Sequence, residues 1–136
     1  MTSPRKLLEY LTENYSVFYE PTLLEIGIHE QIKAAVGDAF TEKTISKLLS
    51  TYTQSAKYNA SLVEYLDFDL YRSNLDGSAG ALVTDESKRH HVNKFLVALK
   101  RKELKEDVSH YADLREQAVE WLEWGIIECS EDNASI

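Results

Sequence analysis

The stretch DFDLYRSNLDGSAGALV, residues 67–83, interrupts a chain whose other hydrophobic residues follow a helical period. Within it, Phe68, Leu70 and Arg72 occupy alternate positions, and a period of two predicts a strand. Residues 74–77 read Asn-Leu-Asp-Gly, and the Asp-Gly pair favours a tight hairpin turn. Residues 81–83 supply a short return strand, so the whole stretch predicts a β-hairpin.

Helices are predicted before the hairpin. Ser3 is a good N-cap and Pro4 suits the first helical position, so the first helix begins there. The apolar spacing over residues 26–36 predicts a second helix. Thr41 can cap a third helix, whose apolar stripe continues as far as Ala56.

Two further helices are predicted after the hairpin. The first, over residues 86–104, is capped by Thr84 or Asp85 and has a buried stripe that includes Phe95. The second covers residues 107–127. The predicted fold class is therefore mostly α with one β-hairpin (α+β). We expect a domain over residues 1–105, followed by an acidic amphipathic helix and tail over residues 106–136.

Length and composition place the chain among ordinary globular proteins. It has 136 residues, of which 43% are hydrophobic and 28% are charged. Its apolar runs are shorter than the ~18–20 residues that cross a bilayer, so we expect no membrane partner. The single cysteine, Cys129, cannot form an internal disulfide, which fits a cytoplasmic location.

The charges are segregated along the chain. The net charge is −8, but residues 88–105 alone carry +6 and residues 111–136 carry −6. An anionic partner responds to a local patch more than to the total, because the Debye length is about 8 Å at physiological salt. An acidic protein with a basic helix therefore remains compatible with nucleic-acid binding.

The sequence contains no recognisable catalytic or metal-binding pattern. None of the four histidines lies three or four residues from another histidine or from the cysteine, as helical metal sites require. Gly77 and Gly80 lack the spacing and lysine of a phosphate-binding loop. We therefore expect no metal, no cofactor and no enzymatic activity.

Three motifs occur in order along the chain: LEIGI at residues 24–28, YTQSAKY at 52–58 and YRSNLDG at 71–77. Together they resemble the ProQ/FinO family of bacterial RNA chaperones, over roughly residues 5–102. The resemblance implies a fold in which helices flank a β-hairpin, here with an extra acidic helix at the C-terminus.

The resemblance implies an RNA-binding protein or RNA chaperone of the bacterial cytoplasm. Such proteins recognise structured RNA hairpins with a single-stranded 3′ end, including terminators and small RNAs, in post-transcriptional regulation. The alternative is a FinO-like fold repurposed as a protein-interaction or regulatory module with weakened RNA binding.

The resemblance also assigns residues. Arg72 matches the family's hairpin arginine, Tyr58 its tyrosine near the RNA 3′ terminus, and Lys57 the basic residue before that tyrosine. Aromatic rings beside cations also suit stacking on unpaired bases with phosphate contact. The expected RNA-binding residues are Arg72, Tyr58, Lys57, Lys47, Lys43, Lys94 and Arg101.

The chain departs from the family at four positions where basic residues are usual. These positions hold Glu25, Glu42, Ser46 and Ser50. Lys43 and Lys47 each lie one residue later on the same exposed face of the predicted helix. We therefore expect the charge to be relocated, with Glu25 and Glu42 opposing it.

The last helix carries more apolar surface than one buried stripe needs, including Trp121 and Trp124. Three interpretations follow. The helix packs on its own domain, it lies across the basic patch and competes with RNA, or it mediates self-association or contact with a protein partner.

Overall fold

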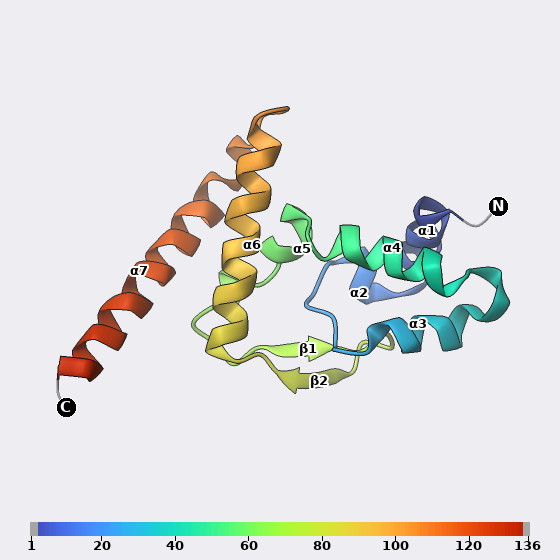
Figure 1. Ribbon diagram of the computed structural model, residues 1–136, viewed down its shortest axis with the longest axis horizontal. Helices are drawn as coiled ribbons and strands as arrows, with labels where there is room; N and C mark the ends of the chain where they lie inside the picture. Colours follow the sequence, from blue (N-terminus) through green and yellow to red (C-terminus); the bar gives the residue numbers. More distant parts are fainter. Residues whose placement is uncertain (1–2, 135–136) are drawn as a thin grey trace.

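The hairpin predicted over residues 67–83 is present, and helices surround it (Figure 1). The computed structural model describes residues 3–134, with side chains through residue 124. Strand β1 (Tyr71–Ser73) pairs antiparallel with β2 (Ala79–Leu82), and the register shifts between the two ends of β1. Gly77 takes the positive φ of +89° that the turn requires. The return strand begins two residues before the predicted one.

The hairpin is anchored to the segment around residue 24, far away in sequence. The N–H of Ser73 donates to the Leu23 carbonyl at 2.7 Å, and the N–H of Glu25 donates to the Ser73 carbonyl at 2.9 Å. These bonds form a parallel bridge between Leu24 and Ser73. Two of the three motifs are thereby held side by side.

The N-terminal half is helical, as predicted. Helices α1 (Pro4–Asn14), α2 (Ser16–Tyr19) and α3 (Ile28–Val36) come first, followed by the short 3₁₀ turn η1 (Gly37–Ala39). Ser3 caps α1, because its hydroxyl accepts from the Lys6 N–H at 3.2 Å. Helix α3 begins at residue 28 instead of 26, since Gly27 has a φ of +92° that lies outside the helical region.

The third predicted helix is divided in two. Helix α4 (Glu42–Tyr52) is capped by Thr41, and α5 (Ala56–Ala60) is capped separately by Ser55. The short η2 (Val63–Tyr65) leads into the hairpin. Helix α6 (Asp85–Glu103) begins after Thr84, whose hydroxyl accepts from the Ser87 N–H, and α5 packs against it.

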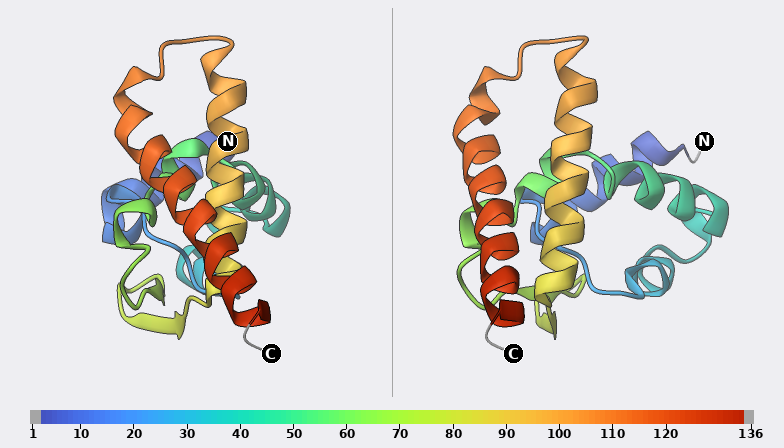
Figure 2. Two further views of the ribbon diagram at one scale, coloured as in Figure 1. Left: turned by 90° about the vertical axis from the view of Figure 1, so that its left-hand side faces the viewer. Right: turned by 60° about the vertical axis from the view of Figure 1, so that its left-hand side comes forward.

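The last helix turns back beside α6 (Figure 2). The prediction began it at residue 107, but η3 (Ser109–Tyr111) comes first and α7 spans Ala112–Ala134. Asp107 explains the difference, because its carboxylate accepts from both the N–H and the hydroxyl of Ser109 and forms a turn there. No helix within residues 3–134 is long and apolar enough to cross a bilayer.

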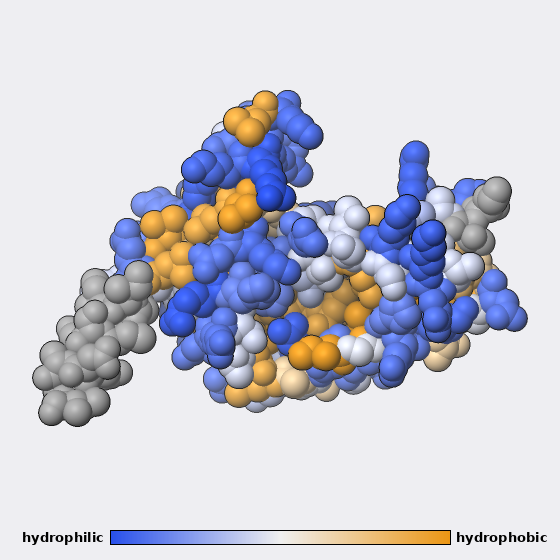
Figure 3. All heavy atoms as spheres, in the orientation of Figure 1, coloured by the Kyte–Doolittle hydropathy of each residue, from blue (hydrophilic) through white to orange (hydrophobic). Residues whose placement is uncertain are grey.

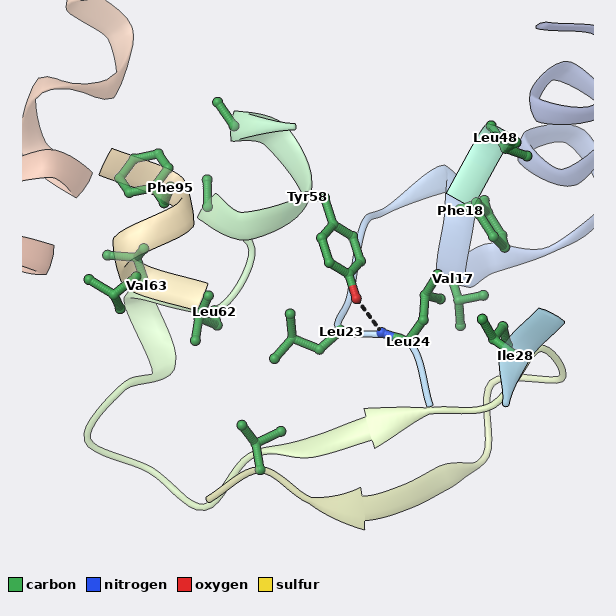
Figure 4. Close-up of a cluster of buried hydrophobic side chains, with 14 of the residues drawn as sticks. Val17, Phe18, Leu23, Leu24, Ile28, Leu48, Tyr58, Leu62, Val63 and Phe95 are labelled. Atoms are coloured by element: carbon green, nitrogen blue, oxygen red, sulfur yellow. Dashed lines mark hydrogen bonds between the residues drawn. The ribbon is translucent and has the colours of Figure 1, made fainter. Parts of the chain in front are cut away.

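One continuous core joins these elements. Leu7, Ile32, Ile45 and Phe95 are completely buried, so α1, α3, α4 and α6 all contribute to it. Figure 4 shows the centre of this core, where Tyr58 lies among aliphatic and aromatic side chains. The core fixes α6 and the hairpin relative to α4, and the candidate site lies where they meet.

Candidate nucleic-acid interface

A hollow of about 410 Å³ lies where β1, the segment 24–28 and α6 meet, with α4 on its other side. Figure 3 shows an apolar floor between hydrophilic side chains carried by α6 and α4. The polar residues that line the hollow are Glu25, His29, Thr53, Tyr58, Arg72, His90 and His91. The hollow therefore contains two of the expected RNA-binding residues, Arg72 and Tyr58.

Arg72 is half-buried and points from β1 toward the segment at residue 24. Its Nη1 donates to the Leu24 carbonyl at 3.2 Å. This bond uses one of the five guanidinium donors and fixes the direction of the group. A guanidinium held in this way is suited to a phosphate, which accepts two parallel hydrogen bonds from it.

Tyr58 is only 2% exposed, so its ring is part of the core and is not offered for stacking on a base. Its oxygen accepts from the Leu24 N–H at 2.9 Å, as Figure 4 shows. Burial is the main cause that raises the pKa of this phenol, which therefore keeps its proton. Arg72 and Tyr58 thus bind the two backbone groups of Leu24, its carbonyl and its N–H. The Tyr58 hydroxyl retains a proton to donate.

His91 is a polar wall residue that the sequence analysis did not identify. Its Nδ1 lies 2.9 Å from the Asn59 Oδ1. The Asn59 amide donates to the carbonyls of Thr53 and Ser55, so its oxygen is the acceptor and Nδ1 of His91 carries the hydrogen. Burial, followed by the nearby Arg72 charge, lowers the pKa of His91 to about 4. At neutral pH, His91 is therefore uncharged, with Nε2 as an acceptor.

The sequence does contain a signal for the burial of His91. His91 lies four and eight residues before Phe95 and Leu99, which places it on the buried stripe of α6. Its ring packs edge-on against Tyr58 with centroids 6.2 Å apart. Histidine, tyrosine and arginine thus meet in one hollow.

Glu25 stands where the family usually has a basic residue, and its carboxylate binds the backbone. It accepts from its neighbour Ile26 at 2.8 Å and from the Ala81 N–H of β2. These bonds lower the pKa of Glu25, with the Ala81 N–H as the largest cause. A Cβ at Gly80 would collide with this carboxylate, so a larger residue there would displace the Glu25 side chain. Glu25 therefore fastens the hairpin to the segment 24–28.

The lysines of α4 and α5 lie elsewhere. Lys43 and Lys47 are exposed on α4 but do not line the hollow. The α4 residue that lines the hollow is Leu49, and the hydroxyl of Ser46, three residues earlier, lies 3.1 Å from Nε2 of His29. Lys57 lines a different hollow, formed with α1, α2 and the end of α4. The structure therefore does not bring all the expected cations to one place.

Lys94 and Arg101 lie on α6 beside the hollow. They line an adjoining depression that shares His90 with it. Four of the seven expected residues, Tyr58, Arg72, Lys94 and Arg101, thus lie along one connected surface.

Lys88 was counted in the +6 patch, and the structure corrects this. The residue is 6% exposed, and its ammonium donates to the carbonyls of Leu66 and Phe68, both at 2.9 Å. These bonds tie the segment before β1 to α6. Lys88 is therefore a structural residue, and the solvent-facing charge of α6 is smaller than the sequence suggested.

Helix α7 does not lie across the basic surface in the described residues. It packs on the other side of α6, as Figures 1 and 2 show, with the Tyr111 and Phe95 ring centroids 5.9 Å apart. Val108 and Ala118 are buried there, and Trp121 packs on the core, whereas Trp124 is 64% exposed. The interpretation of α7 as a competitor of RNA is therefore wrong for this arrangement. Cys129 has no described side chain.

Among the side chains described through residue 124, no group of three or more histidine, cysteine or acidic residues could hold a metal ion. The groups that line the hollow include the guanidinium of Arg72, the phenol of Tyr58 and the imidazole of His91.

Comparisons with known proteins agree with this fold. The model of the ProQ/FinO family matches residues 1–108. Among solved structures, a FinO-like RNA chaperone from Neisseria meningitidis is similar, with 21% sequence identity and a TM-score of 0.57, over 76% of this chain and 85% of that chain. No curated protein matches the chain significantly. Since the family match spans well over half of the chain and the fold agrees with that of a FinO-like protein, the chain belongs to the ProQ/FinO family.

Proposed function

We propose that this protein binds RNA and acts as an RNA chaperone without catalysis or a cofactor. Its targets are structured hairpins with a single-stranded 3′ end, as in terminators and small RNAs, and it works in post-transcriptional regulation in a bacterial cytoplasm. The observation that carries the proposal is the convergence of Arg72, Tyr58 and His91 on one hollow. Family membership supports it, and so does the description of the similar Neisseria meningitidis protein as a FinO-like RNA chaperone.

The groups in the hollow complement the end of an RNA strand. Arg72 offers charged donors to the last phosphate. A ribose hydroxyl is both a donor and an acceptor. Tyr58 has a proton to donate, and neutral His91 can accept one. A terminal ribose with free hydroxyls would satisfy both residues, whereas a blocked end would leave them unpaired.

A binding assay with two matched RNAs tests this proposal. One RNA is a terminator-like hairpin with a U-rich tail and a free 3′ hydroxyl, and the other carries a 3′ phosphate. We expect the blocked RNA to bind roughly tenfold more weakly, the effect of about one lost buried hydrogen bond with its partners left unpaired. Equal affinity for the two RNAs at the same salt would contradict recognition of the 3′ end.

The second candidate is a protein-interaction or regulatory module on the same fold. The observation in its favour is the acidic depression between α6 and α7. Its walls carry Glu103, Glu106, Asp107, Glu116 and Glu120, with Arg115 as the single cation. A protein that ignores hairpin RNA at low salt but retains a partner through this acidic side would support this candidate.

A further inference from the structure

A depression of about 740 Å³ lies between α6 and α7, near the loop that joins these two helices (Figure 2). We call it the α6–α7 depression. Its apolar lining comes from Leu99, Val108, Tyr111, Ala112 and Val119, and Val119 is 39% exposed. Helix α7 forms one wall and lies wholly beyond residue 108, where the match to the family model ends. A segment outside the matched part of the chain therefore builds half of this surface.

The rim of the α6–α7 depression is anionic. Among the described residues that line it, five carry carboxylates, and three of these have partners within the chain. Glu103 pairs with Arg115 across the two helices at 3.0 Å, and Glu106 pairs with Lys102 at 3.3 Å. Asp107 is used by the turn that precedes η3. The charge of these three groups is therefore partly satisfied by the protein itself.

The other two carboxylates of the rim, Glu116 and Glu120, have no ion-pair partner among the described side chains. They lie one turn apart on α7, and like charges at this i,i+4 spacing destabilise a helix. Both are exposed, and both lie next to the apolar Val119 in the lining. A cation bound between them would relieve their repulsion, so the pair favours a cationic ligand.

The apolar lining and the anionic rim together define the class of ligand. The rim repels phosphates, which disfavours a nucleic acid. A small hydrophilic cation would leave the apolar lining in contact with water. An amphipathic helix satisfies both parts, because its apolar face covers the lining while its lysines and arginines reach the rim through their aliphatic stems.

We infer that the α6–α7 depression is the docking site for a cationic amphipathic helix of a protein partner. From Ala112 to Glu120 the chain advances eight positions, about 12 Å at 1.5 Å per residue, so the contact covers about two turns of the partner. A contact of this size is typical of a weak, reversible interaction. The inference goes beyond RNA binding and leaves the hollow free, because α7 lies on the other side of α6.

Fluorescence anisotropy with two labelled peptides tests this inference. The probe is an amphipathic peptide of leucine and lysine, about 14 residues or four helical turns long. The control peptide has the same composition, but its leucines are distributed around the whole helix. Both peptides are titrated with the full chain at low and at high salt.

Two variants with the same loss of charge are compared. The rim variant is Glu116→Gln with Glu120→Gln. The matched control is Glu13→Gln with Glu20→Gln, which removes the same charge from exposed positions outside the depression. Circular dichroism and thermal melting verify that both variants are folded.

We expect the rim variant to bind the amphipathic peptide roughly tenfold more weakly than the wild type at low salt, the effect of two partly exposed ion pairs. The control variant should keep the affinity of the wild type. Arg115→Ala should bind the peptide roughly threefold more tightly, because it frees the carboxylate of Glu103. Equal affinities of the rim variant and its control would overturn the inference. So would equal binding of the two peptides by the wild type, or no binding of either.

Separate titrations with hairpin RNA distinguish this inference from the proposed function. The rim variant should bind the RNA with the affinity of the wild type, since its substitutions lie on the α7 side of α6. A protein that binds the amphipathic peptide but not the RNA refutes the proposed function and keeps the docking site. A protein that binds the RNA but not the peptide does the reverse.

Discussion

On the side of α6 that faces the hollow, Lys94 and Arg101 line a groove whose other wall is polar and uncharged. On the side that faces α7, carboxylates dominate, and Glu103 is paired with Arg115 at 3.0 Å. One helix thus separates a cationic surface from an anionic one. The comparison shows why the net charge of −8 is a poor guide to function, since a ligand meets one side at a time.

The two sides also differ in what they do for stability. The α7 side buries apolar groups such as Val108 and Ala118 against the core. The hollow side contains polar groups, including His91, that are held by hydrogen bonds. Truncating the α7 side should therefore change stability more than RNA binding, and substitutions on the hollow side should change RNA binding, with an effect on stability where a buried group such as His91 is involved.

The largest effect is expected from truncation after Lys105. It removes Val108 and Ala118 together with the packing of Tyr111 and Leu114. At roughly 1.5–3 kcal/mol for each large buried side chain, the loss in unfolding free energy is about 5 kcal/mol. Urea denaturation measures it. A truncated protein that is equally stable and binds RNA more tightly would restore the competing role for α7.

A smaller effect is expected from the protonation of His91. Because its pKa is lowered to about 4 in the folded protein, only the unfolded chain takes up this proton between about pH 6.5 and pH 4. Stability therefore falls as the pH falls through this window, by about 1.5 kcal/mol between pH 6.5 and pH 5. Urea denaturation at several pH values measures this loss.

The variant His91→Gln serves as the control for this pH dependence. It cannot titrate in this range, so its stability should change less between pH 6.5 and pH 5 than that of the wild type. The same pH dependence in both proteins would show that the pKa of His91 is not lowered in the folded protein.

The smallest effect is expected from Arg115→Ala on the α7 side. Its ion pair with Glu103 is partly exposed, and such pairs contribute less than about 1 kcal/mol. RNA affinity should stay the same or rise slightly, since the groove is on the other side of α6. A tenfold loss of RNA binding in a gel shift would mean that the anionic side also takes part.

Local signals in the sequence predicted most of the fold. Ser3, Thr41 and Thr84 are side-chain caps at the helix starts where they were expected. The Asp-Gly turn and the alternating residues before it predicted the hairpin. The structure confirms the hairpin, but β1 contains only Arg72 of the three alternating residues, because Phe68 and Leu70 lie before the strand. These features depend on neighbouring residues, so a single sequence is enough to find them.

Features that depend on distant partners could not be predicted. Lys88 appeared to be a surface cation, but its ammonium is satisfied by the carbonyls of Leu66 and Phe68 across the fold. Tyr58 was expected to offer its ring, yet the ring packs in the core and the hydroxyl accepts from the Leu24 N–H. The apolar stripe of α7 likewise predicts that one face of this helix is buried. It does not predict against which side of α6 that face packs.

The hollow that contains Arg72 is the proposed RNA-binding site. The most direct test compares Arg72→Ala with Arg89→Ala, which removes the same charge from an exposed position on α6 outside the hollow. Both are measured against one hairpin with a free U-rich 3′ tail at ~100 mM salt. We expect Arg72→Ala to weaken RNA binding by about 1–3 kcal/mol and Arg89→Ala to change it by much less. Equal dissociation constants for the two variants would contradict this assignment.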